Sequence, residues 1–133
     1  MNDLITEEVM PALEGAIPSI MATASADGMP NATYIWQVFY VDEKHVAISN
    51  QFLNKTSRNI ACNPYACLLV TSPVTQLQYK LHVKYTGSQQ SGAVFDKMAM
   101  QAEIIAGGHN RGKFELHSAD IYEILKVECI DLK

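Results

Sequence analysis

The sequence predicts a mainly β protein in which six strands form an antiparallel barrel, closed or partly closed, with short helices between some strands. Three observations support this fold class. Apolar, β-branched and aromatic segments recur between turn signals, most connections have hairpin length, and residues 77–85 alternate strictly between apolar and polar side chains. Too few strand pairs are separated by a crossover helix for a doubly wound parallel sheet.

Length, composition and charge restrict the class of protein further. The chain has 133 residues, 48 % hydrophobic and 18 % charged, which is typical of one globular domain. Its formal net charge of −4 and the lack of a basic patch argue against a nucleic-acid partner. No apolar run reaches the roughly 20 residues of a membrane span, and no signal peptide is recognisable. We therefore expect a single cytoplasmic domain over residues 1–133, with a helical segment at residues 1–16 and no membrane partner.

The first half of the chain reads as a short helix followed by three strands. Thr6 can cap a helix over residues 6–15, although Pro11 makes its boundaries uncertain. Residues 18–25 form the first strand, and the Asp27-Gly28 pair is a hairpin turn signal. The return strand, residues 31–41, is apolar on both faces, so we expect it inside the sheet or against a partner. The third strand follows at residues 45–49.

The second half adds two helices and three strands. A helix over residues 55–62 begins at Asn54 and is stopped by the Asn63-Pro64 pair. Residues 65–71 and 77–85 form the fourth and fifth strands, and the alternation of the fifth is that of a half-buried antiparallel strand. A further helix opens at Ser91, and residues 119–130 form the last strand.

The segment from Ser49 to Ile60 is the most informative for chemistry. It combines a strand end, a polar loop and a helix start, where free backbone N–H groups and the helix dipole favour phosphate. Lys55 and Arg58 add positive charge, and Asn54 is among the neutral donors. An ordinary capped surface helix with Asn54 as its N-cap explains the same residues, and both readings remain open.

Other candidates carry weaker signals. Trp36 can stack on a planar ligand or belong to the core or an interface. The four histidines and the three cysteines have no metal-ligand spacing, and no nucleophile motif is present. We therefore expect no metal site, and reduced thiols at the cysteines. The glycine-rich segment at residues 106–112 reads as a helix end and loop, or as a flap over a ligand.

Several segments in order resemble the pyridoxamine 5′-phosphate oxidase-like FMN-binding split-barrel family. They are Ile17-Pro18, residues 27–31, residues 40–42 and residues 54–64, the last ending in Asn63-Pro64 before an apolar strand. The resemblance covers nearly everything between residues 14 and 130. It implies a six-stranded antiparallel split β-barrel, a homodimer and an FMN site at the subunit interface.

The resemblance also implies which residues contact the cofactor. Ile48 and Ser49 match the strand end beside the flavin, while Lys55 and Thr56, next to Asn54, match the pair that holds the phosphate. The segment along the ring system comprises Thr33, Tyr34, Ile35 and Trp36. A polar contact from the fifth strand falls on Gln78 or Tyr79.

This chain departs from the pattern at positions that are basic in the family, which read Thr33, Val38 and Thr56 here. Lys55 is then the main expected phosphate anchor, and the C-terminal Arg and His motif of the true oxidases is not visible. We expect an FMN-binding protein similar to flavin oxidoreductases, with substrate and electron donor unassigned and no pyridoxamine phosphate oxidation. The alternatives are a non-enzymatic flavin- or haem-binding sensor or carrier, and a flavin-free structural dimer.

Overall fold

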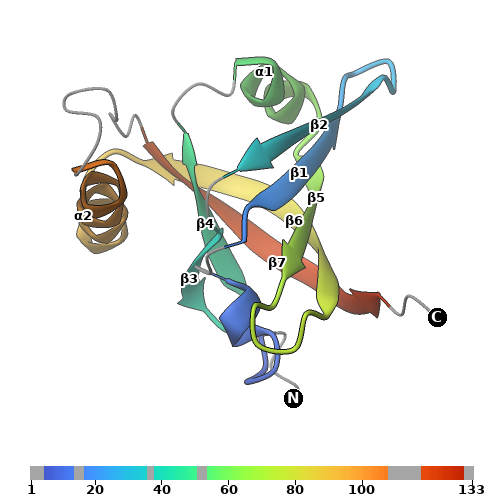
Figure 1. Ribbon diagram of the computed structural model, residues 1–133. Helices are drawn as coiled ribbons and strands as arrows, with labels where there is room; N and C mark the ends of the chain where they lie inside the picture. Colours follow the sequence, from blue (N-terminus) through green and yellow to red (C-terminus); the bar gives the residue numbers. More distant parts are fainter. Residues whose placement is uncertain (1–4, 14–16, 36–37, 51–53, 108–117, 131–133) are drawn as a thin grey trace.

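A single antiparallel sheet of seven strands, in the order β2-β1-β5-β6-β7-β4-β3, forms the body of the computed structural model (Figure 1). The structure describes residues 5–13, 17–35, 38–50, 54–107 and 118–130. The strands are β1 (Ser19–Ala24), β2 (Pro30–Ile35), β3 (Val38–Asp42), β4 (His45–Asn50), β5 (Tyr65–Thr71), β6 (Gln78–Gln89) and β7 (Ser118–Ile130). The helices are η1 (Met10–Ala12), α1 (Asn54–Cys62) and α2 (Ala93–Gly107). The predicted mainly β barrel class is confirmed.

The strand expected at residues 31–41 is in fact two strands, β2 and β3, which is why the sheet has seven. β2 pairs with β1 and β3 pairs with β4, so the two occupy opposite ends of the sheet order. Residues 36–37, which join them, lie outside the described residues. Three steps of 3.8 Å separate the Cα atoms of Ile35 and Val38 by at most about 11 Å. The strands at the two ends of the sheet order, β2 and β3, therefore come within this distance of each other, which curls the sheet into a barrel.

The inner faces of the strands form the main hydrophobic core. Residues that alternate along β6 enter it, with Tyr79, Leu81 and Val83 all at most 4 % exposed. The N-terminal segment packs on the same core through Ile5 and Val9. Within residues 5–13, this segment forms the 3₁₀ turn η1 in place of the helix expected over residues 6–15. Proline is tolerated at the start of a helix but removes a backbone donor further in, which favours this short turn.

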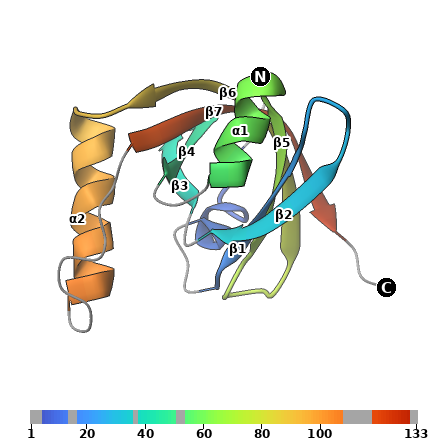
Figure 2. The same cartoon turned by 90° about the horizontal axis from the view of Figure 1, so that it is seen from above.

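A second, smaller cluster lies on the outside of the barrel under α2. Met98 of α2 packs with Phe39 of β3, Ala47 of β4 and Ala119 of β7, all at most 5 % exposed. Figure 2 shows α2 beside the barrel, and α1 over the side of the barrel that faces the viewer. The two apolar faces of β3 are thus both covered within one chain: Val38 faces the core and Phe39 faces α2.

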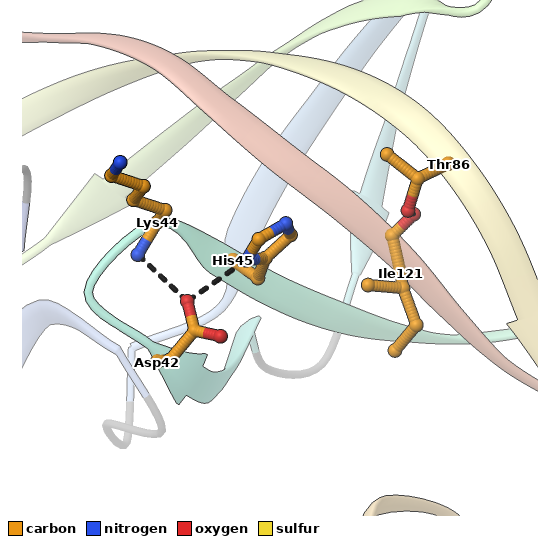
Figure 3. A network of polar contacts seen from close by, with 5 residues as sticks. All are labelled: Asp42, Lys44, His45, Thr86 and Ile121. Carbon is orange, nitrogen blue, oxygen red and sulfur yellow. Dashed lines mark hydrogen bonds and ion pairs between the residues drawn. The ribbon is translucent and has the colours of Figure 1, made fainter.

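The carboxylate of Asp42 stabilises the turn between β3 and β4. Asp42 Oδ1 accepts a hydrogen bond from the backbone N–H of Lys44 at 2.8 Å and lies 2.8 Å from Nδ1 of His45 (Figure 3). Burial alone would raise the pKa of Asp42, but the bonds from Lys44 and His45 outweigh it and lower that pKa. The ionised form of Asp42 is therefore the one that holds the turn.

No helix within the described ranges is long and apolar enough to cross a membrane. The three cysteines, Cys62, Cys67 and Cys129, are free thiols.

Candidate functional site

Helix α1 is fixed to the barrel by one buried face. Thr56, Asn59 and Ile60 recur at the i, i+3 and i+4 spacing of a helical stripe, and each is at most 7 % exposed. The Asn59 side-chain amide donates to Thr23 Oγ1 of β1 at 3.1 Å, and that of Asn31 in β2 donates to Thr56 Oγ1 at 3.4 Å. Lys55 and Arg58 lie on the exposed face. In the first turn of α1, Lys55 is thus exposed to solvent while Thr56 packs against the barrel.

A cleft of about 140 Å³ lies beside α1, between the helix and the long strands β6 and β7. Its lining comprises Thr56, Ser57, Ile60 and Ala61 from α1, Tyr85 and Ser88 from β6, and Asp120 and Tyr122 from β7. Pockets that enclose a whole cofactor-sized ligand usually measure roughly 300–1,000 Å³. The cleft is therefore large enough for one end of such a ligand and too small for all of it.

A β-bulge at Thr86 brings Tyr85 and Ser88 to the same wall of the cleft. Residues three positions apart point to opposite faces of a regular strand. Here the pairing steps from Tyr85 opposite Tyr122 directly to Gly87 opposite Ile121, which leaves Thr86 as an extra residue. Thr86 Oγ1 donates to the carbonyl oxygen of Ile121 at 3.0 Å (Figure 3). The bulge shifts the phase of alternation, so that Ser88 lies opposite Asp120 on the cleft side.

The strand wall of the cleft carries a chain of hydrogen-bonded polar groups. Asp120 Oδ1 accepts bonds from Ser88 Oγ at 2.7 Å and from Ser118 Oγ at 2.8 Å. The hydroxyl of Tyr85 is hydrogen-bonded to Ser88 Oγ. We call Tyr85, Ser88, Asp120 and Ser118 the hydroxyl–carboxylate chain. Among the described residues that line the cleft, Asp120 is the one with a formal charge.

Tyr122 forms the apolar part of the same wall. It is 2 % exposed, and its ring meets that of Tyr85 edge-on, with centroids 5.5 Å apart. Burial, with smaller contributions from Asp120 and Tyr85, raises the pKa of Tyr122. Tyr122 therefore remains a neutral phenol at physiological pH.

Of the predicted site residues, Thr56 lines this cleft, and four others lie on α1 or on β4, next to the elements that form it. Lys55 is exposed on the first turn of α1, and Asn54 is the first residue of that helix. In β4, Ile48 pairs with Asp120 and Ser49 pairs with Ala119, so both lie next to the strand that forms the cleft wall. The side chain of Ile48 belongs to the core and that of Ser49 is half-buried.

The predicted site residues of β2 differ in how far their side chains are exposed. Thr33 is half-buried, Tyr34 is 73 % exposed, and Ile35 is buried in the core. Trp36 falls outside the described residues. Of the three that the structure describes, Tyr34 has the most exposed side chain and can contact another molecule.

Gln78 and Tyr79 are not brought to the cleft within one chain. Tyr79 precedes Tyr85 by six positions along β6, about 20 Å at the rise of a strand. Its side chain is 4 % exposed in the core, and its hydroxyl has no hydrogen-bond partner among the described residues. Burial, then the nearby Cys129 and Glu8, raises the pKa of this tyrosine. A ligand contact from either residue stays a prediction.

Sequence reasoning missed the strand wall, namely Tyr85, Ser88, Asp120 and Tyr122 as site residues. Strict alternation along β6 places Tyr85 on the apolar face but gives no reason to add Ser88. Asp120 becomes a candidate only when β7 is known to pair with β6, because the two residues lie 32 positions apart. The sequence signal for this wall is therefore weak.

Metal binding finds no support in the part of the chain that the structure describes, where no cluster of three or more His, Cys, Asp or Glu side chains forms. His45 contacts Asp42, and His82 Nε2 lies 2.7 Å from Glu128 Oε1. Neither histidine is among the residues that line the cleft. His109, His117 and residues 108–112 of the glycine-rich segment fall outside the described residues, and so does any flap that they form.

The fold is an antiparallel β-barrel with a polar cleft beside a short helix, and comparison with known proteins places it in a family. The model of the pyridoxamine 5′-phosphate oxidase family matches residues 5–127, which is most of the chain. The chain belongs to this family. The uncharacterised protein MJ0282 of Methanocaldococcus jannaschii is 41 % identical over 66 residues, which are 48 % of this chain and 44 % of that protein. The match thus spans less than half of that relative's length.

Solved structures share the split-barrel fold. An FMN-binding protein from Syntrophomonas wolfei superposes with a TM-score of 0.72 at 17 % identity, covering 95 % of this chain and 92 % of that chain. The haem storage protein HutZ from Vibrio cholerae superposes with a TM-score of 0.62 at 15 % identity, covering 94 % of each chain. At these identities the likeness establishes the fold, and the ligand has to be argued from the site.

Proposed function

We propose that this chain is an FMN-binding protein that holds the flavin phosphate at the first turn of α1 and part of the remaining cofactor in the adjacent cleft. The observation that carries the proposal is the juxtaposition of exposed Lys55, the start of a firmly anchored helix and a polar cleft. The S. wolfei FMN-binding protein with the same fold supports flavin as the ligand.

The residues at the start of α1 fit a phosphate group. The helix spans nine residues with no acidic residue in its first turn, so its free N–H groups favour an anion. Lys55 adds a charge, and Thr56 and Ser57 add hydroxyls. The position of Val38, where true oxidases of the family carry a lysine, is 0 % exposed in the core and cannot contribute a cation. Lys55 therefore bears most of the charge-assisted binding in this proposal.

The proposed assembly is a homodimer in which the second copy covers the part of the flavin that the cleft leaves outside. The cleft of about 140 Å³ holds only one end of a cofactor of this size. Tyr34 at 73 % exposure is an aromatic surface suited to a ring or to a partner. The apolar second face of β3 no longer supports a dimer, since α2 of the same chain covers it.

FMN, when bound, supplies hydride and electron transfer, and the chain supplies binding, orientation and electrostatics. In this proposal α1 binds the phosphate, while the strand wall positions the rest of the molecule. The described residues that line the cleft include no histidine, cysteine or lysine that could act as a proton donor or base. The carboxylate of Asp120 is the ionisable acid among them. The proposal accordingly leaves pyridoxamine phosphate oxidation aside and leaves the substrate open.

The absorbance spectrum of the purified full chain, followed by titration with FMN, tests the proposal. We expect flavin bands, or saturable quenching of FMN fluorescence at one equivalent per chain. A Soret band after purification or after haem addition, without flavin binding, would favour the haem-binding alternative. Protein that takes up neither ligand would leave the flavin-free structural dimer.

A further inference from the structure

The hydroxyl–carboxylate chain fixes which way its protons point. An ionised carboxylate has no proton to donate, so Ser88 and Ser118 must donate to Asp120 Oδ1. A serine hydroxyl has a single proton, and that of Ser88 is thereby used. The hydrogen bond between Tyr85 and Ser88 must then be donated by Tyr85. Each hydroxyl proton of the chain is directed along the wall toward Asp120.

The part of the wall formed by Tyr85, Ser88 and Asp120 directs its hydroxyl protons toward Asp120, and so offers oxygen lone pairs to a ligand. Tyr85 has donated its one proton to Ser88, so its oxygen meets the cleft as an acceptor. Asp120 is the charged residue among the described residues that line the cleft, and its charge is negative. An anion that lay against Tyr85 and Asp120 would meet repulsion and no hydrogen-bond donor from these two side chains. A group that carries O–H or N–H would find acceptors already in place.

We infer that the β6–β7 wall is a specificity element that binds an uncharged or cationic, hydrogen-bond-donating part of the ligand and excludes its anionic part. This inference rests on the proposed function and deepens it. Applied to FMN, the phosphate lies at α1, and the ribityl hydroxyls or the ring N–H contact Tyr85 and Asp120. The wall thereby fixes the direction in which the cofactor enters the cleft.

Riboflavin is the sharpest probe because it keeps the donor groups of FMN and lacks the phosphate. Wild-type protein, Asp120→Asn and Tyr85→Phe are titrated with riboflavin and with FMN by fluorescence quenching, and the fold of each variant is checked by circular dichroism and thermal unfolding. Asp120→Asn should weaken riboflavin binding about tenfold, since a charge-assisted hydrogen bond is lost. The loss for FMN should be smaller, because removing a negative charge also favours the phosphate.

Tyr85→Phe provides an independent arm should Asp120→Asn fail to fold, and we expect it to weaken riboflavin binding about threefold to tenfold. Glu123→Gln is the matched control: it removes a carboxylate from β7 outside the cleft lining and should leave both affinities unchanged. Unchanged or tighter riboflavin binding by a folded Asp120 or Tyr85 variant overturns the inference alone. So does wild-type protein that binds FMN but not riboflavin. Wild-type protein that binds neither flavin overturns the proposed function together with the inference.

Discussion

Lys55 and Val38 are matched by the family resemblance to two positions that are basic in the pyridoxamine 5′-phosphate oxidases, and their surroundings in this chain differ completely. Lys55 is exposed on the first turn of α1, whereas Val38 is fully buried between the strands. A charged side chain at the site of Val38 would have to be desolvated at a cost of several kcal/mol. The buried site of Val38 therefore does not suit a cation, and in the proposed function Lys55 supplies most of the positive charge for the phosphate.

Replacing Lys55 with alanine should weaken FMN binding by about tenfold or more, because one charge-assisted contact contributes about 1.5–3 kcal/mol. Riboflavin, which has no phosphate, should bind the variant as it binds the wild type. Isothermal titration with the two flavins measures both effects. Lys44→Ala is the charge-matched control, since Lys44 is exposed in the β3–β4 turn. Equal FMN affinity in Lys55→Ala and wild-type protein would refute the assignment.

The residues of the cleft also show how far sequence reasoning reaches at this scale. Lys55 and Thr56 follow from a local pattern, because a polar loop that leads into a helix start is visible in consecutive residues. Asp120 and Ser88 meet only through strand pairing, and Ser88 turns toward the cleft only because Thr86 forms a bulge. Neither the pairing of β6 with β7 nor the bulge at Thr86 is visible in the local periodicity of the sequence. The strand wall therefore cannot be predicted from it.

At the scale of elements, α1 depends on a buried polar pair for its position. Asn59 and Thr23 are each 5 % exposed, and the amide of Asn59 donates to the Thr23 hydroxyl. A buried pair of this kind contributes little beyond an apolar pair of the same shape, but removing one partner leaves the other unsatisfied. The helix is thus held by a contact whose loss is costly.

Asn59→Ala should lower the free energy of unfolding by about 1–3 kcal/mol, since it removes this hydrogen bond and leaves the Thr23 hydroxyl buried without it. Urea unfolding of the ligand-free protein measures the change. Arg58→Ala, at the neighbouring exposed position of the same helix, should stay within about 0.5 kcal/mol of the wild type. Similar losses in both variants would show that α1 is held by other contacts.

The elements themselves were largely predictable. β1, β4, β5, α1 and β7 begin and end within one or two residues of the ranges that turn signals and apolar patterning indicate. The prediction of one continuous strand at residues 31–41 was wrong. An unbroken apolar and β-branched segment does not show where the chain leaves one partner strand and begins to pair with another. β6 extends to Gln89, four residues beyond the predicted alternation, since the bulge at Thr86 breaks the period there.

For the whole molecule, the proposed dimer is the property most open to direct measurement. We expect light scattering at micromolar concentration to report a mass of two chains, because a cleft that holds only part of a flavin needs a second surface to cover it. Tyr34→Asp should shift the protein toward monomer by placing a charge on an exposed aromatic position. Val74→Asp alters a side chain that is 76 % exposed in the turn between β5 and β6 and serves as the control. A stable wild-type monomer would refute the dimer.

The place of β7 in the sheet has a consequence for how the protein is made. β7 lies between β6 and β4, so the group β2-β1-β5-β6 and the hairpin β4-β3 are joined in the sheet through it. Of the seven strands it is also the last to leave the ribosome. The two parts of the barrel can form local hairpins early. They cannot pair through β7 until residues 118–130 have been synthesised, and pairing between segments distant in sequence is slow. Until then the edges of β4 and β6 that pair with β7 lack this partner, and unpaired strand edges favour aggregation.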